Sequence, residues 1–128
     1  MGQQYLIDSN AVIDYLSGKL PEKGMSFMNQ VINNIPNISG ITKIEVLGYR
    51  TTHEAYKLLT GFVDDSIVIG LTDDIVERTI GIRKKMKIKT PDALIAATAI
   101  VNQLTLISRN TKDFDKIEGL DVINAHKV

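Results

Sequence analysis

Residues 90–108, TPDALIAATAIVNQLTLIS, contain the stretch that decides the fold. Residues 90–102 read as a helix that is apolar on nearly every face, which is typical of a helix buried inside a protein. Residues 105–108 follow after a short break as an apolar, strand-like run. We therefore expect a helix in the middle of the fold, followed directly by a strand.

The same alternation of strands and helices extends on both sides of this stretch. Further strands are predicted at residues 4–7, 37–39, 66–69 and 121–123. Helices are predicted at residues 11–16, 25–35, 41–49 and 56–62, from the capping Thr72 to about Lys87, and as a single turn at 110–114. Strands joined by helices imply right-handed crossovers and a mostly parallel sheet. The prediction is one α/β domain over residues 1–128, with three α/β/α layers and a central sheet of four or five strands.

Bulk properties narrow the class of protein. The 128 residues suit one domain, and the longest apolar runs fall short of the roughly 20 residues that a membrane span needs. The opening MGQQYLID lacks the basic-then-apolar order of a secretory signal, so we expect a cytoplasmic protein without membrane contact. The chain has no cysteine and two histidines, His53 and His126, which favours hard, oxygen-binding cations over zinc.

Four short motifs place an acid near the start of a predicted helix. They are YLIDSN with Asp8, ITKIEVLG with Glu45, TPDALIAATA with Asp92 and ISRNTKDF with Asp113. Three of these motifs directly follow strand-like runs, and strand-to-helix junctions of a parallel sheet lie along one edge. The four carboxylates are therefore expected to meet there and to hold a divalent metal.

Helix capping explains each acid taken alone. The expected caps are Asp8 itself, Thr42 with Glu45 at capping-box spacing, Thr90, Pro91 and Asp92 as N-cap, N1 and N2, and Asn110 with Asp113. The combination favours a metal, because carboxylates about 4 Å apart repel by roughly 4 kcal/mol at an effective dielectric of 20, and a cation reverses that cost. Mg²⁺ fits best, with Mn²⁺ as a substitute, since it binds carboxylates and keeps waters for a phosphate substrate. Metal-activated water needs no protein nucleophile, which suits a chain where Ser9 has no histidine beside it.

The four motifs together resemble the PIN domain, specifically the small VapC-type toxins of prokaryotic toxin–antitoxin pairs. The resemblance covers essentially the whole chain, from YLIDSNAVIDYL through ITKIEVLG and TPDALIAATAI to LISRNTKDF, in the family's order. It implies a metal-dependent endoribonuclease that hydrolyses RNA phosphodiester bonds, forms a homodimer and is silenced by an antitoxin protein.

Carried over to this chain, the resemblance assigns roles to individual residues. Asp8, Glu45 and Asp92 correspond to the core metal ligands and catalytic acids, and Asp113 to a more variable fourth acid, with Asp115 as its rival. Ser9 and Asn10 correspond to residues that orient a ligand or contact water. Asn110 fits the last motif, where it reads as a helix cap and a supporting hydrogen-bond donor.

The basic residues have two readings of about equal weight. The formal net charge is zero, yet Arg83, Lys84, Lys85, Lys87 and Lys89 cluster before Asp92. A solvated helix end explains such a run as well as phosphate binding does. The candidate RNA phosphate contacts are Lys84, Lys85, Lys87, Lys89, Arg109 and Lys112.

Alternatives remain for one helix and for the function. Met25, Met28 and Ile32 have the spacing of a core-facing stripe, but flexible methionines also suit a groove for an antitoxin. The chain could instead be a non-catalytic PIN-fold binding module. A phospho-accepting receiver domain is a third reading, although it expects paired acids where Asp8 is followed by Ser9.

Overall fold

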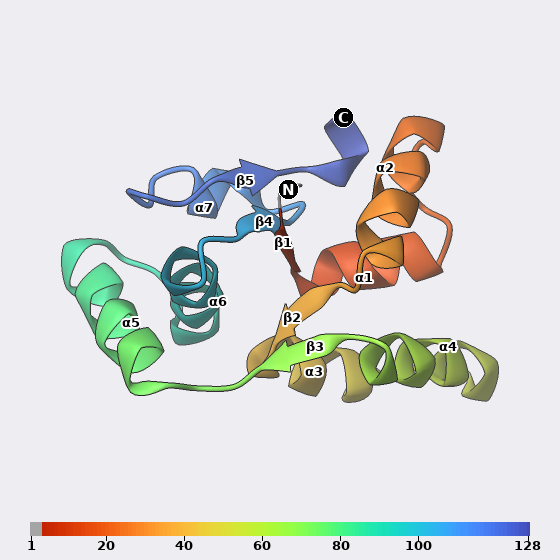
Figure 1. Ribbon diagram of the computed structural model, residues 1–128, viewed down its shortest axis with the longest axis horizontal. Helices are drawn as coiled ribbons and strands as arrows, with labels where there is room; N and C mark the ends of the chain where they lie inside the picture. Colours follow the sequence, from red (N-terminus) through yellow and green to blue (C-terminus); the bar gives the residue numbers. More distant parts are fainter. Residues whose placement is uncertain (1–3) are drawn as a thin grey trace.

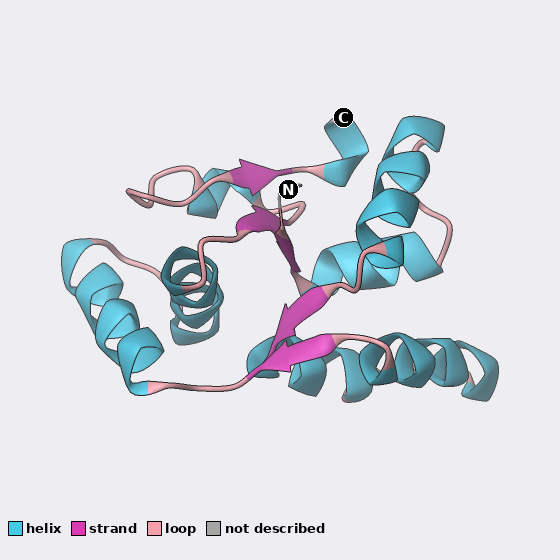
Figure 2. Cartoon of the chain, viewed as in Figure 1, coloured by secondary structure: helices cyan, strands magenta, loops and turns pink. Residues whose placement is uncertain are grey.

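The sheet at the centre of the molecule has five strands, all parallel, in the order β3-β2-β1-β4-β5. The structure is a computed structural model that describes residues 4–128. The expectation that the opening MGQQYLID is not a secretory signal falls partly on residues 1–3, which lie outside the described residues. The strands are β1 (Tyr5–Ile7), β2 (Asn37–Ser39), β3 (Ile67–Ile69), β4 (Thr105–Ile107) and β5 (Val122–Ile123). Every predicted strand is confirmed, most of them one residue shorter than expected (Figure 2).

Helices cover both faces of the sheet, which confirms the three-layer architecture. They are α1 (Ser9–Leu16), α2 (Glu22–Asn33), α3 (Gly40–Leu47), α4 (His53–Asp64), α5 (Asp73–Lys85), α6 (Thr90–Val101), α7 (Thr111–Phe114) and a final 3-10 turn, η1 (Ala125–Lys127). In Figure 1, α5 and α6 lie on one side of the strands and α1, α2 and α4 on the other, with the C-terminal turn beside α2.

The core consists of two apolar clusters separated by the sheet. Alternation along the central strands divides the side chains, because neighbours in a strand point to opposite faces. Leu6 and Leu106 join the cluster under α5 and α6, whereas Ile7 and Ile107 join the cluster under α1 and α2. Helix α6 is buried as predicted, with small alanine side chains that let it approach the sheet closely.

Helix α2 contributes to the core rather than to an open groove. Met28 is fully buried, and Met25 and Ile32 pack against the same cluster, which confirms the core reading of this stripe. The helix ends at Asn33, so the extension to Ile35 was wrong. A residue before proline is disfavoured in the helical conformation, which is consistent with a helix that ends before Ile35. Ile35 itself has a φ of 58° and is 60% exposed.

Strand β3 forms one edge of the sheet and is unusually exposed. Ile67 is 52% exposed and Val68 37% exposed. Among residues 4–128, no helix is both long and apolar enough to cross a membrane.

Candidate metal centre

Asp8 lies where the strand order reverses, between β1 and β4 at their carboxyl ends. Ligands of open α/β sheets bind at this kind of switch point. Asp8 follows β1 directly, and its backbone N donates to the Ile107 carbonyl oxygen of β4 at 2.9 Å. Its side chain caps α1 as expected, accepting a hydrogen bond from Ser9 N at 2.8 Å. The carboxylate is therefore fixed by the sheet and is only 5% exposed.

Ser108 is the main partner of this carboxylate, and the sequence reasoning missed it. Its buried Oγ donates to Asp8 Oδ2 at 2.8 Å and accepts from Asn110 N at 3.1 Å. Asn10 Nδ2 donates to Asp8 Oδ2 at 3.3 Å and to Ser108 Oγ at 3.2 Å. The feature that could have indicated Ser108 is its position at the end of β4, because β4 is the strand beside β1.

Glu45 is exposed on α3 and joins the site through Ser9. Ser9 Oγ donates to Glu45 Oε1 at 3.1 Å, so the hydroxyl between Asp8 and Asn10 orients a second acid. The expected capping box of Thr42 and Glu45 was wrong. Ser39, at the end of β2, is the N-cap, and its Oγ accepts from Thr42 N at 3.0 Å, which starts the helix earlier than predicted.

Asp92 lies in the first turn of α6, one position later than expected. The N-cap is Lys89, which makes no side-chain capping bond, and Thr90 is the first helical residue. The assignment of Thr90 as N-cap was therefore wrong; Pro91 favours an early helix start because it has no N–H to satisfy. Asp92 still has the first-turn place at which a negative charge suits the helix dipole.

Asp113 lies on the four-residue helix α7 and is exposed. Asn110 is the N-cap residue, but its side chain makes no capping bond; instead its Nδ2 donates to Asp113 Oδ2 at 3.1 Å. Asn110 is thus the helix cap that the sequence predicts, although its side chain donates to Asp113 instead of capping the helix. Asp115 is also exposed, at the end of the same helix.

The charges of the four acids are coupled. The pKa of Asp8 is raised, mainly by burial, and the negative charges of Glu45 and Asp92 raise it further, against the hydrogen bonds from Ser108 and Ser9. Burial also raises the pKa of Asp92, as does the charge of Asp113, while Lys89 lowers it. Asp113 rather than Asp115 is thus the acid coupled to Asp92. Glu45 and Asp92 thus act on Asp8, and Asp113 acts on Asp92.

The donor set fits a hard divalent cation, which binds oxygen ligands and relieves such repulsion. The two histidines do not join it: His53 starts α4, and His126 Nε2 lies 2.9 Å from Asp14 Oδ2. Within residues 4–128, no three Asp, Glu or His side chains stand close enough together to hold a metal as they are. The side chains as placed therefore do not gather the four acids at one point, and two of them, Glu45 and Asp113, are exposed.

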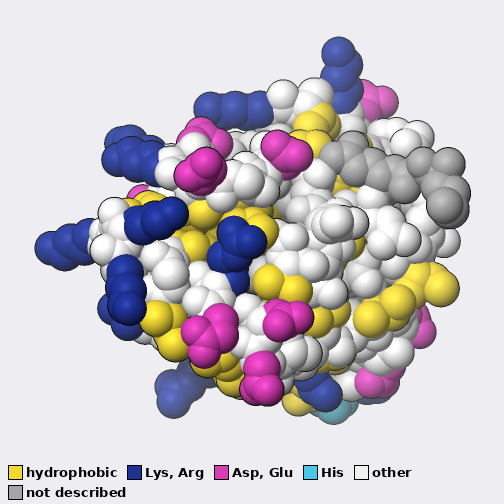
Figure 3. Space-filling model, turned by 60° about the vertical axis from the view of Figure 1, so that its left-hand side comes forward, with side chains coloured by type: hydrophobic (Ala, Val, Ile, Leu, Met, Phe, Trp, Pro, Cys, Tyr) yellow, Lys and Arg dark blue, Asp and Glu magenta, His cyan; other side chains and the backbone are white. Residues whose placement is uncertain are grey.

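The expected basic residues are spread over the end of α5, the α5–α6 loop and the β4–α7 region. Arg83, Lys84 and Lys85 end α5, Lys87 and Lys89 lie in the following loop, and all five are exposed. Figure 3, which brings the α5 side forward, shows Lys and Arg side chains interspersed with Asp and Glu. Lys112 is exposed on α7, whereas the Arg109 guanidinium pairs with Asp14 at 3.0 Å.

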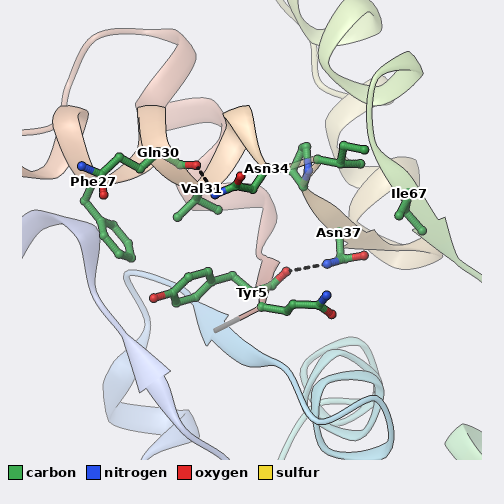
Figure 4. Close-up of a pocket in the computed structure, with 10 residues that line it drawn as sticks. Tyr5, Phe27, Gln30, Val31, Asn34, Asn37 and Ile67 are labelled. Atoms are coloured by element: carbon green, nitrogen blue, oxygen red, sulfur yellow. Dashed lines mark hydrogen bonds between the residues drawn. The ribbon is translucent and has the colours of Figure 1, made fainter. Parts of the chain in front are cut away.

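Among residues 4–128, two of the hollows lie away from the acids. One, of about 560 Å³, lies at the opposite edge of the sheet and is lined by Tyr5, Phe27 and Ile67 among others (Figure 4). The other, of about 970 Å³, runs along α5. None of the four acids lines either of these two hollows.

Comparisons with known proteins agree with this geometry. The sequence profile of the PIN domain family matches residues 5–120. Ribonuclease VapC1 of Rickettsia felis is 46% identical over 41 residues, which span 32% of this chain and 31% of that relative. A toxin-antitoxin complex from Klebsiella pneumoniae contains a chain that is 32% identical, with a TM-score of 0.75, covering 98% of this chain and 100% of its own. The DNA-bound VapBC of Salmonella typhimurium is 21% identical with a TM-score of 0.79, over 97% and 99% of the two chains, and shares the fold. The chain belongs to the PIN domain family.

Proposed function

We propose that this chain is a divalent-metal-dependent endoribonuclease that hydrolyses RNA phosphodiester bonds and acts as the toxin of a toxin–antitoxin pair. The succession of coupled carboxylates Glu45, Asp8, Asp92 and Asp113, at the carboxyl edge of a PIN domain, supports this proposal most directly. The relative with the name ribonuclease and the toxin–antitoxin complexes add to it.

Asp8, Glu45, Asp92 and Asp113 would hold Mg²⁺, or Mn²⁺ in its place. The bound ion supplies an acidified water as nucleophile and a counter-charge for the phosphodiester. Ser108 and Asn10 keep Asp8 Oδ2 oriented, and Ser9 does the same for Glu45 Oε1.

Lysines beside the centre would contact the phosphates of RNA. Lys89 is one helical turn before Asp92 and close enough to lower its pKa, so it is the first candidate, followed by Lys84, Lys85, Lys87 and Lys112. Arg109 is a weaker candidate, because its guanidinium already pairs with Asp14 at 3.0 Å. Such contacts hold the backbone without reading its sequence.

The decisive experiment compares two nearby exposed acids, one on α7 and one at its C-cap. Asp113→Asn is expected to lower RNA cleavage strongly, and Asp115→Asn, the matched control, to leave it near the wild-type rate. Asp92→Asn should abolish cleavage while the protein stays folded by circular dichroism. Cleavage is measured with purified, antitoxin-free protein over a titration of Mg²⁺ or Mn²⁺ against a chelator. Wild-type cleavage by Asp92→Asn, or full activity in chelator, would refute the proposal.

The same assay separates the non-catalytic alternative. A PIN-fold module that only binds would take up Mn²⁺ yet cut none of a diverse set of RNAs. The receiver-domain alternative has lost its support, because the chain belongs to another family and a single Asp8 follows β1.

The proposal includes two protein partners and a cytoplasmic location, where cellular RNA is accessible. The solved complexes of similar chains support an antitoxin partner, and a homodimer is the expected state of the free toxin. Size-exclusion chromatography with light scattering would give twice the 14.2 kDa chain mass for the dimer. A monomer at assay concentrations would contradict this part alone.

A further inference from the structure

Asp14 is a buried carboxylate that the proposed chemistry does not use. It lies in the second turn of α1 and is only 4% exposed. Arg109 Nη1 donates to its Oδ2 at 3.0 Å and to its Oδ1 at 3.3 Å. His126 Nε2 lies 2.9 Å from the same Oδ2. Three segments that are distant in sequence thus meet at one side chain.

The Arg109 contact continues to the candidate metal centre. Arg109 follows Ser108 directly, and its backbone N donates to Asn10 Oδ1 at 2.9 Å. Asn10 then directs its Nδ2 to Asp8 Oδ2 at 3.3 Å. The side chain of Arg109 is therefore fixed by Asp14, while its amide fixes the residue that contacts Asp8.

The His126 contact ties the C-terminal turn to the same point. Asn124 Oδ1 accepts from His126 N at 2.9 Å and caps the turn η1. The turn packs so closely on α2 that a Cβ at Gly24 would lie 2.1 Å from the Ala125 carbonyl oxygen. The position of His126 is thus set by backbone packing, which in turn holds Asp14 from its second side.

Stability alone does not explain a carboxylate at this position. Removing a carboxylate from water costs several kcal/mol, and an apolar residue of similar volume often serves a core equally well. The Arg109 side chain is 59% exposed, so its attraction to Asp14 is screened by solvent. An apolar residue could not accept hydrogen bonds from Arg109 and His126, so it could not orient these two side chains.

We propose that Asp14 is a positioning residue for the Asp8 carboxylate, acting through Arg109 and Asn10. The inference rests on the proposed function only in so far as Asp8 binds a metal; the hydrogen-bonded link itself is a property of the metal-free protein. It extends the candidate centre to a residue of α1 that contacts it through Arg109.

The first test uses the metal-free protein and therefore does not depend on activity. Asp14→Asn is compared with Tyr15→Phe, a matched control on the same helix that loses the hydrogen bond from Tyr15 Oη to Asn29 Oδ1. In ¹⁵N-resolved NMR, solvent exchange of the Arg109 amide is expected to become at least about tenfold faster in Asp14→Asn and to stay unchanged in the control. Arg109→Met, which alters a mostly exposed side chain, keeps the test open if Asp14→Asn fails to fold.

The second test measures Mn²⁺ affinity by electron paramagnetic resonance, well below the unfolding temperature. Loss of a direct supporting partner weakens metal binding about 10- to 100-fold, so loss of this more distant one should weaken it about three- to tenfold. Unchanged Arg109 exchange overturns the proposal. Unchanged affinity beside a loosened amide also overturns it, because Asp8 then keeps its position without the link. If the wild type binds no Mn²⁺, the proposed function fails, and the Arg109 amide still decides whether Asp14 positions Asn10.

Discussion

Ser108→Ala should destabilise the protein by an amount that depends on pH. Ser108 is fully buried and donates to the Asp8 carboxylate at 2.8 Å, and a hydrogen bond to a charged group contributes about 1.5–3 kcal/mol. The substitution also removes the acceptor of Asn110 N, while Asn10 Nδ2 keeps its contact with Asp8. We expect the free energy of unfolding to fall by about 2–4 kcal/mol at neutral pH.

The pH dependence follows from the raised pKa of Asp8. Because burial raises this pKa, native Asp8 keeps its proton at pH values where the unfolded chain has lost it, so stability falls as pH rises through that interval. The Ser108 hydrogen bond is the largest influence that lowers the pKa. In Ser108→Ala the native pKa of Asp8 therefore rises further, and the pH interval over which stability falls extends to higher pH. The deficit of the variant should therefore be largest at neutral pH and smaller below the ordinary aspartate range, where Asp8 is protonated in both proteins.

The free energy of unfolding at neutral and at acidic pH is measured by urea unfolding in the presence of a chelator, followed by circular dichroism. Ser39→Ala is the control, since Ser39 is equally buried at the end of β2 but bonds only neutral groups of Thr42. It should lose about 0.5–2 kcal/mol, with no added dependence on pH. An equal deficit for Ser108→Ala at neutral and acidic pH would refute the assignment of Ser108 as the partner of an ionised Asp8.

Three further predictions test the centre and the C-terminal turn. Mn²⁺ at ten times its dissociation constant should add about 1.4 kcal/mol to the free energy of unfolding, seen as a rise in Tm that a chelator reverses; no rise would exclude tight metal binding to the native state. Asp92→Asn should lose this metal-induced rise in Tm. Its free energy of unfolding without metal should change by less than about 1 kcal/mol, because relief from the charge of Asp113 offsets the lost interaction with the α6 dipole. A metal-induced rise in Tm that persists in Asp92→Asn would remove Asp92 from the ligand set. Gly24→Ala should lower the free energy of unfolding in urea by about 1–3 kcal/mol, because its Cβ would lie 2.1 Å from the Ala125 carbonyl oxygen. The control Gly61→Ala, on α4 with open space around it, should not destabilise the protein. Equal effects of the two substitutions would contradict the close packing of the turn.

Local chemistry made much of the fold predictable from sequence. The apolar runs of β1 and β4 and the all-round apolar α6 define the sheet and its central helix without knowledge of partners. Thr72 caps α5 as expected, with its Oγ1 accepting from Ile75 N at 3.3 Å. Helix starts were less predictable at Ser39 and Lys89, because several nearby residues could cap equally well and tertiary packing selects among them.

The sequence singles out the candidate acids by position, but it does not reveal the hydrogen-bond partners of Asp8. Asp8 and Asp92 are marked by their positions after a strand and at a helix start. Ser108 contacts Asp8 across 100 residues, and Asp14 meets Arg109 across 95 and His126 across 112. No local pattern encodes contacts of this separation, since they depend on which strands become neighbours and on where the C-terminal turn packs.

The exposed strand β3 has a practical consequence for these measurements. Its edge is unpaired among the described residues, and neither Ile67 nor Val68 carries a charge that would repel another strand. Open apolar edges are templates for edge-to-edge pairing between molecules, and natural proteins blunt them with lysine, proline or a covering segment. Self-association through β3 should therefore grow with protein concentration and be reversed by dilution, independently of any metal.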